Sequence, residues 1–121
     1  MDKIFMKQLS FYAYHGTYPE ENRLGQHFYV DLEMKLDLKE AGTTDDLEKS
    51  VDYTKVYESV RQEMTETRVK LIEKLAEQIA GRLLADFPVE EVLVRITKPN
   101  PPIPGHYQSV GVEIVRKRHE R

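Results

Sequence analysis

Residues 92–115 read VLVRITKPNPPIPGHYQSVGVEIV, and this stretch decides how the rest of the chain can fold. Val92, Val94 and Ile96 alternate with other side chains, as the side-chain period of two in a β-strand requires. Lys98 ends this apolar row, and four of the next six residues are proline. Proline has a fixed φ and no N–H group, so it ends the strand's hydrogen-bond ladder and stiffens the loop. The stretch therefore predicts two strands, the second over residues 109–115, joined by a stiff loop.

Lys98 is the leading candidate for a functional residue. A two-residue turn would join two strands at less conformational cost than this proline-rich loop, so the loop indicates a use other than chain reversal. The alternative is a surface lysine at the edge of a sheet, which is common and needs no function. As a strand-end residue, Lys98 is expected to contribute little to stability. Spacing alone leaves both interpretations open.

Composition limits the class of protein. A chain of 121 residues predicts one domain, residues 1–121, with a single core. The net charge of −3 and the pI of about 5.8 give no basic surface for nucleic acid or an anionic membrane. The absence of cysteine excludes disulfides, thiolate metal sites and a cysteine nucleophile. The sequence shows no signal peptide and no apolar run of about 20 residues, so we expect a soluble cytoplasmic protein.

The first half of the chain predicts two strands. Residues 2–14 are rich in β-branched and aromatic types and predict a first strand, with a possible bulge near residues 8–10. Residues 17–26 have neither helical nor strand periodicity, so we expect a loop that carries Glu20 and Glu21. Residues 28–38 alternate cleanly between apolar and polar side chains, which predicts a long strand buried on one face.

The second half predicts two helices and the two strands already described. Residues 40–50 form a polar connector, and apolar residues then recur at helical spacing over 53–64, with Asp52 as a plausible N-cap. A second helix covers residues 71–84 and stops near the Phe87-Pro88 pair. The order ββααββ predicts an α+β fold with a four-stranded antiparallel sheet and two helices on one face. Because such a sheet has two open edges, we expect subunits to join their sheets into a closed ring.

Few kinds of chemistry fit the remaining side chains. The four histidines, at positions 15, 27, 106 and 119, lack the spacing of a zinc site, so no metal is expected. No phosphate-binding glycine loop or G-x-S-x-G motif is present. The chemistry that remains is general acid–base catalysis by lysine, tyrosine and glutamate side chains. Tyr53 at the start of the first helix is either a packed tyrosine or a group in a cleft. Glu73 is either a favourable first-turn carboxylate or a fixed acceptor for paired N–H donors.

Several segments together resemble the dihydroneopterin aldolase family of folate biosynthesis. They cover essentially the whole chain in the same order: FYAYHG (11–16), EENRLGQ (20–26), DLKEAGTTDDL (37–47), VDYTKVY (51–57), LIEKLAEQIA (71–80) and RITKPNPPIPGHY (95–107). The proline-rich stretch after Lys98 is the most specific part. The family has the tunnelling fold, in which the sheets of several subunits form a ring, commonly a tetramer, and two rings stack as an octamer. The resemblance therefore implies a homo-oligomer with pterin sites between subunits.

The resemblance also implies roles for individual residues. Glu73 resembles the residue that holds the 2-amino and ring N–H groups of the pterin, with the backbone near Ile72 as part of the pocket. Lys98 resembles the general acid and base, and Tyr53 its partner across the subunit interface. Glu21 resembles the carboxylate that faces the hydroxylated side chain of the substrate. We prefer it to Glu20 because it directly precedes the Asn22-x-x-Gly25-Gln26 frame.

The implied reaction is a retro-aldol cleavage without metal, Schiff base or cofactor. It converts 7,8-dihydroneopterin into 6-hydroxymethyl-7,8-dihydropterin and glycolaldehyde, with some epimerisation to dihydromonapterin. The C=N bond of the dihydropterin can accept the electrons that enzymes otherwise direct to a lysine imine or a divalent metal. The alternatives are an epimerase of dihydroneopterin or its triphosphate, or a non-catalytic pterin-binding protein. A triphosphate site should show clustered arginine and lysine, whereas Arg95 is expected on the opposite strand face from Lys98.

Overall fold

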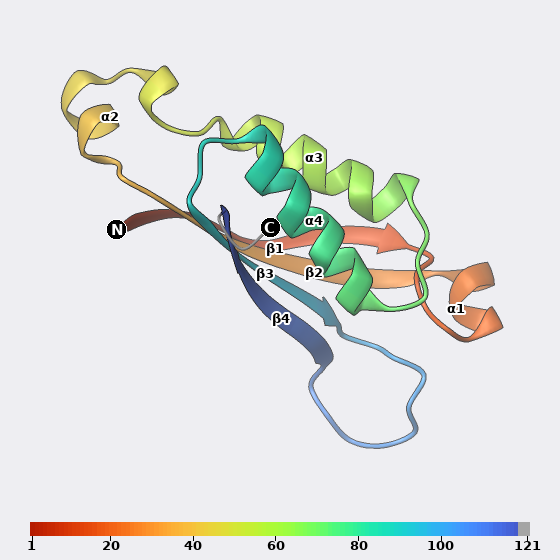
Figure 1. The fold of residues 1–121 in the computed structure, drawn as a ribbon. Coiled ribbons are helices and arrows are strands. Elements are labelled where there is room, and N and C mark those ends of the chain that lie inside the picture. The colour runs from red at the N-terminus through yellow and green to blue at the C-terminus, as the bar shows by residue number, and fades with distance from the viewer. Residues whose placement is uncertain (119–121) are drawn as a thin grey trace.

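A computed structural model describes residues 1–118, which form one sheet covered by two long helices (Figure 1). The strands are β1 (Asp2–Ala13), β2 (Gln26–Leu36), β3 (Glu91–Lys98) and β4 (Val110–Lys117). They pair antiparallel in the order β1-β2-β3-β4. The helices α3 (Tyr53–Glu66) and α4 (Ile72–Asp86) lie on the same face of the sheet (Figure 1). The predicted α+β fold is confirmed.

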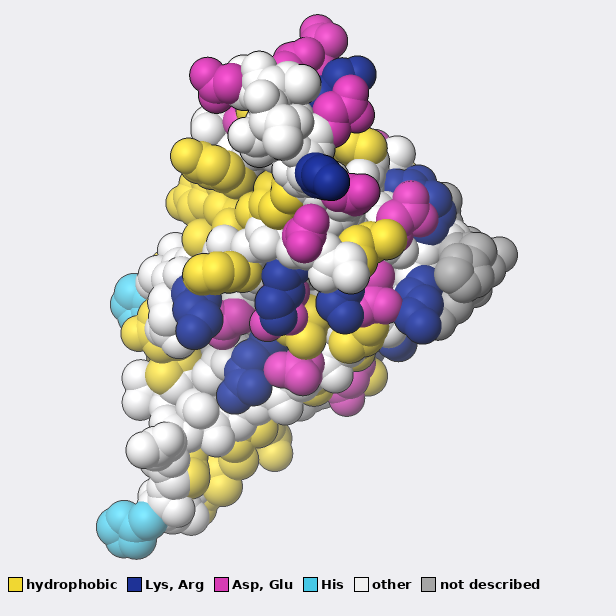
Figure 2. Space-filling model, turned by 90° about the vertical axis from the view of Figure 1, so that its left-hand side faces the viewer, with side chains coloured by type: hydrophobic (Ala, Val, Ile, Leu, Met, Phe, Trp, Pro, Cys, Tyr) yellow, Lys and Arg dark blue, Asp and Glu magenta, His cyan; other side chains and the backbone are white. Residues whose placement is uncertain are grey.

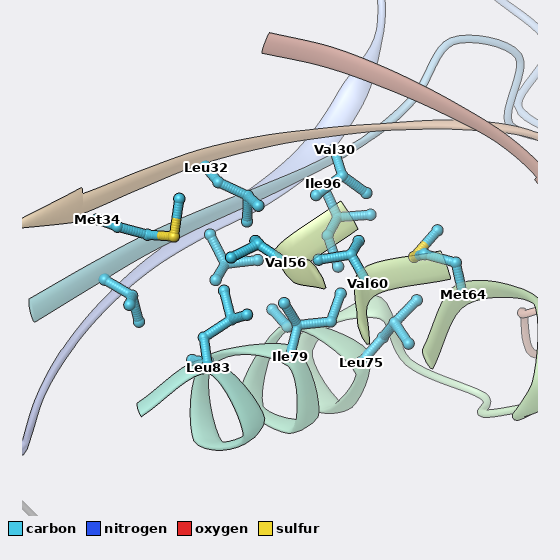
Figure 3. Packing of buried hydrophobic residues seen from close by; sticks show 14 of the residues in the cluster. Val30, Leu32, Met34, Val56, Val60, Met64, Leu75, Ile79, Leu83 and Ile96 are labelled. Atoms are coloured by element: carbon cyan, nitrogen blue, oxygen red, sulfur yellow. The ribbon is translucent and has the colours of Figure 1, made fainter. Parts of the chain in front are cut away.

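The core lies between this sheet face and the two helices (Figure 3). The central strands contribute paired rows, in which Val30 lies opposite Ile96, and Leu32 lies opposite Val94. The helices contribute apolar side chains at helical spacing, and Figure 3 labels Val56, Val60, Met64, Leu75, Ile79 and Leu83 among them. All are buried. Sequence periodicity therefore places both helices correctly, and Asp52 caps α3 by accepting a hydrogen bond from the backbone N of Thr54 at 3.0 Å.

The edge strand β1 contains the predicted bulge. Its register against β2 shifts between Met6 and Leu9, and Gln8 takes a left-handed conformation with φ of 56°. The backbone N–H of Gln8 donates to Oδ1 of Asp31 on β2, with an N···O distance of 2.8 Å. A side chain of the neighbouring strand therefore satisfies a backbone group that the bulge removes from the ladder.

Two segments expected to be irregular are helical instead. Residues 17–26 contain α1 (Pro19–Leu24), and residues 40–50 overlap α2 (Lys39–Thr44) and a 3₁₀-helix, Leu47–Lys49. The predicted loop and connector are therefore wrong. These helices have too few turns to show amphipathic periodicity, and they are marked only by end signals such as Pro19 at the first turn. The second strand also ends at Leu36 rather than at residue 38, because Leu38 already precedes α2.

Charged side chains of both signs are mixed on the surface. Figure 2 shows lysine and arginine interspersed with acidic side chains over the middle of one face. Several such charges pair between neighbouring strands, as in Lys3 with Glu33 at 3.0 Å and Lys35 with Glu91 at 3.0 Å. Arg95 pairs with Glu113 at 3.2 Å and is exposed. Among residues 1–118, no helix has the length and apolar character needed to cross a bilayer.

Candidate active site

Lys98 forms a largely buried ion pair. It continues the row of Val92, Val94 and Ile96 that faces the helices, and its side chain is only 14% exposed. Its Nζ donates to Oε2 of Glu21 at 2.9 Å, and the Glu21 side chain is 5% exposed. The interpretation of Lys98 as an exposed edge lysine therefore does not fit the structure. The two residues are 77 positions apart in the chain, and the end of β3 and the first turn of α1 bring them together.

Glu21 is held by three donors. Besides Lys98, Nε2 of Gln26 donates to Oε2 of Glu21 at 2.8 Å, and the backbone N of Tyr18 donates to Oε1 at 3.3 Å. Tyr18 directly precedes α1, so Glu21 satisfies one of the N–H groups left free where that helix begins. Burial raises the pKa of Glu21, but the hydrogen bonds from Lys98, Gln26 and Tyr18 and the charge of Lys98 together hold that pKa below its ordinary value. Glu21 is therefore an ionised acceptor at neutral pH.

Gly16 makes room for this carboxylate. It has φ of 149°, a conformation that side chains with a Cβ rarely adopt. A Cβ built at this position would overlap the carboxyl group and Cβ of Glu21. The position of Glu21 therefore depends on glycine in the turn between β1 and α1.

His15 lies next to this turn and is fully buried. Its Nε2 lies 2.8 Å from the carbonyl oxygen of Met64, and its Nδ1 accepts a hydrogen bond from the backbone N of Val69 at 3.1 Å. Burial lowers the pKa of His15, as do the charges of Arg68 and Lys98, and these effects outweigh the hydrogen bond to Met64, which raises it. The imidazole is therefore neutral, with its proton on Nε2.

The residues expected to hold the pterin lie at the start of α4. Ile72 is buried and Glu73 is exposed, and both belong to the first turn of that helix. In Figure 1 this end of α4 lies on the side of the molecule where α1 and the end of β3 are found. The first turn leaves backbone N–H groups free, so an anionic or acceptor group nearby is favoured.

Tyr53 is not brought to this site within one chain. It is the first residue of α3 and is 62% exposed, and α3 begins on the side of α2, away from α1 (Figure 1). Within residues 1–118 it forms no hydrogen bond with Lys98 or Glu21. The structure thus joins Lys98 with Glu21, places Ile72 and Glu73 at the same end, and leaves Tyr53 elsewhere on the surface.

Sequence reasoning missed the roles of His15, Gly16 and Gln26. The spacing of the histidines bears only on a zinc site, and residues 1–118 contain no group of three or more His, Cys, Asp or Glu residues placed to hold a metal. His119 lies outside the described residues. The one available signal was the His15-Gly16 pair at the end of a strand, because a glycine there indicates a close approach of the backbone to another group.

Comparison with known proteins assigns the family. Residues 4–115 match the family described as FolB, dihydroneopterin aldolase. The chain is 50% identical over 119 residues to dihydroneopterin aldolase of Bacillus subtilis (strain 168), which covers 98% of this chain and 99% of that protein.

Solved structures agree with this assignment. The structure of E. coli dihydroneopterin aldolase in complex with neopterin has a TM-score of 0.88 and 33% identity, covering 96% of this chain and 99% of that one. The dihydroneopterin aldolase of Burkholderia thailendensis bound to guanine has a TM-score of 0.79 and 26% identity, covering 96% and 90% of the two chains. From this match over nearly its whole length, the chain belongs to the dihydroneopterin aldolase family.

Proposed function

We propose that the protein cleaves 7,8-dihydroneopterin into 6-hydroxymethyl-7,8-dihydropterin and glycolaldehyde, a step of folate biosynthesis. The observation that carries this proposal is the buried pair of Lys98 and Glu21 in a chain of this family. A proton-transferring lysine and an ionised acceptor lie side by side, at the end of a strand followed by a stiff loop. Such a pair can move protons at the hydroxylated side chain of a substrate.

Glu73 and Ile72 form the binding end of the proposed site. The pterin ring presents a 2-amino group and an adjacent ring N–H, which one carboxylate can accept together as two parallel hydrogen bonds. Glu73 is exposed, and within residues 1–118 its side chain has no hydrogen-bond or ion-pair partner to displace, while the backbone of Ile72 lies beside it in the first turn of α4. Neopterin and guanine, the ligands of the two related structures, share this pattern of donors.

The chemistry needs proton transfer but no covalent link to the protein. Removal of the proton from the 2′-hydroxyl breaks the C1′–C2′ bond and releases C2′ and C3′ as glycolaldehyde. The electron pair moves onto C1′ and into the C6=N5 bond of the dihydropterin, giving an enamine. Protonation at C1′ then yields the hydroxymethyl product. In our proposal Lys98 transfers these protons, directly or through a water, and Glu21 accepts a hydrogen bond from a substrate hydroxyl.

Tyr53 would complete the site from a neighbouring subunit. Its side chain is exposed at the start of α3, which lies at the opposite end of the molecule from the end of β3 that carries Lys98 (Figure 1). A homo-oligomer in which the start of α3 of one subunit meets the end of β3 of the next would bring the two residues together. Such a contact between different surfaces closes into a ring when the rotation allows it.

The test is incubation of the purified protein with 7,8-dihydroneopterin in the presence of a chelator. We expect glycolaldehyde and 6-hydroxymethyl-7,8-dihydropterin in equal amounts, and no adduct trapped by borohydride, because no metal or imine takes part. A trapped adduct would overturn the proton-transfer mechanism but keep the site. Dihydromonapterin without glycolaldehyde would show an epimerase. Binding of neopterin without any turnover would show a pterin-binding protein.

A further inference from the structure

His15 and Gly16 hold the connector between α3 and α4 by both backbone groups of one residue, Val69. The backbone N of Val69 donates to Nδ1 of His15 at 3.1 Å, and the carbonyl oxygen of Val69 accepts from the backbone N of Gly16 at 3.0 Å. His15 also reaches the carbonyl oxygen of Met64, near the end of α3, at 2.8 Å. Two adjacent residues after β1 therefore fix both the end of α3 and the connector that follows it.

The hydrogen bonds of His15 and Gly16 with Val69 connect the two ends of the proposed site. On one side, Gly16 packs against Glu21, the partner of Lys98. On the other side, Val69 is three residues before Ile72, where α4 begins. Hydrogen bonds at Val69 thus connect the Lys98–Glu21 pair with the start of α4, where Ile72 and Glu73 lie, in addition to the connection through the sheet.

These contacts require that the His15 imidazole is neutral and held in one orientation. Nδ1 must accept from Val69 while Nε2–H donates to Met64, so both ring nitrogens are used. The ring edge also packs against Phe28 of β2, with centroids 5.6 Å apart and planes at 72°. The nearby charges, Arg68 on the connector and Lys98 on β3, are both positive and disfavour a second proton on the ring.

We propose that His15 is a positioning residue, which sets the distance between the Lys98–Glu21 pair and the pterin-binding residues Ile72 and Glu73 by holding Val69. This inference rests on the proposed function, since it assigns the two ends of the site from it. It goes further in naming a buried residue, remote from the substrate, on which productive alignment depends. A displacement of about 1 Å between a bound ring and its reacting groups can cost about a hundredfold in rate.

The test compares His15→Asn with His15→Gln, two variants that each keep one of the two hydrogen bonds. The amide oxygen of asparagine falls near Nδ1 and can accept from Val69, whereas the amide nitrogen of glutamine reaches toward Met64 and leaves the Val69 N–H unpaired. Both should lower the melting temperature. We expect His15→Gln to lower kcat/KM for dihydroneopterin about tenfold to a hundredfold, and His15→Asn to stay within about threefold of the parent protein.

Guanine serves as a second probe, because it carries the ring donors but no hydroxylated side chain. Its Kd should be similar in both variants, since it uses only the Glu73 end. Equal kcat/KM in the two variants, or a loss of guanine binding in His15→Gln as large as its kinetic loss, would overturn the positioning role. Failure of the proposed function is a different result, in which the parent protein itself produces no glycolaldehyde.

A backbone variant covers the case in which a histidine variant does not fold. Val69→Pro removes the N–H that His15 accepts and leaves the imidazole in place, and it should reproduce the kinetic loss of His15→Gln. Lys70→Pro stiffens the same connector without removing that donor and is the matched control. If the two proline variants show the same kcat/KM, the role of the Val69 hydrogen bond is refuted.

Discussion

Lys98 and Glu21 depend on each other for both stability and chemistry. From the sequence, a strand-end lysine is expected to contribute little to stability, but its side chain is buried against a carboxylate that is buried still more deeply. Removal of one member leaves the other as an unpaired charge, which is costly away from water. A variant of Lys98 or Glu21 that tests catalysis must therefore also be tested for its stability.

For Lys98→Ala we expect two separate losses. The kcat for dihydroneopterin should fall by about 10²–10⁴-fold or more, the usual contribution of general acid–base catalysis. The free energy of unfolding should fall by about 1–3 kcal/mol, because Glu21 loses its charged donor. Steady-state kinetics and urea denaturation measure the two effects. Lys39→Ala, on exposed α2, is the control.

The double variant Lys98→Ala/Glu21→Gln separates the two effects. Replacing the buried carboxylate by a neutral amide should restore part of the lost stability without restoring kcat. A kcat near that of the parent protein in Lys98→Ala would remove the residue on which the proposed mechanism depends.

Glu73→Gln should weaken binding and leave the fold intact. The glutamate is exposed in the first turn of α4, so its replacement changes no packing. If its carboxylate accepts two N–H groups of the pterin, loss of that charge should cost about 1.5–3 kcal/mol of binding free energy. Calorimetric titration with neopterin measures this change, with Glu90→Gln, at an exposed position before β3, as a control. Unchanged affinity would place the pterin elsewhere.

At the scale of elements, two buried groups make stability depend on pH. The pKa of His15 is lowered below 6.5 in the folded protein, mainly by burial, so the unfolded chain takes up this proton more readily. The pKa of Glu21 is lowered below 4.5, because its hydrogen bonds to Lys98, Gln26 and Tyr18 and the charge of Lys98 outweigh the effect of burial. Both contributions to stability are therefore complete above the unfolded pKa values and are lost as pH falls.

We expect the free energy of unfolding to begin to fall as pH drops through 6.5, with a further fall below 4.5. Each group contributes a slope of at most about 1.4 kcal/mol per pH unit. Denaturation across this range measures the curve. His15→Asn should remove the first step, whereas His106→Asn, in the exposed loop, should keep it. A flat curve between pH 7 and 5 would contradict a neutral His15.

The accuracy of the sequence predictions followed the length of each element. Strands and helices with several periods of alternation, such as β2 and α4, were placed to within two residues at each end, because burial of one face leaves a pattern. α1 and α2 have six residues each and leave no such pattern. The contacts of Lys98 with Glu21 and of His15 with Val69 join residues 77 and 54 positions apart. A local signal such as the His15-Gly16 pair indicates a close approach but cannot name the distant partner.

At the scale of the whole molecule, the separation of Tyr53 from Lys98 predicts sites shared between subunits. Tyr53→Phe and Lys98→Ala should each be nearly inactive alone. When equal amounts are unfolded together and refolded, random pairing should give about one quarter of the interfaces both native side chains. The activity of the mixture should therefore exceed the sum of its parts, as measured by glycolaldehyde release. Activity equal to that sum, or full activity in a monomer, would place the whole site in one chain.

The bulge in β1 has a consequence for the newly synthesised chain. β1 is an edge strand of twelve residues, and a regular edge of that length would act as a template for aggregation with any other exposed strand. At Gln8 the backbone N–H is turned to Asp31 and the ladder is interrupted. A stray strand can therefore pair over only part of the edge. The bulge therefore disfavours fibril formation along this edge.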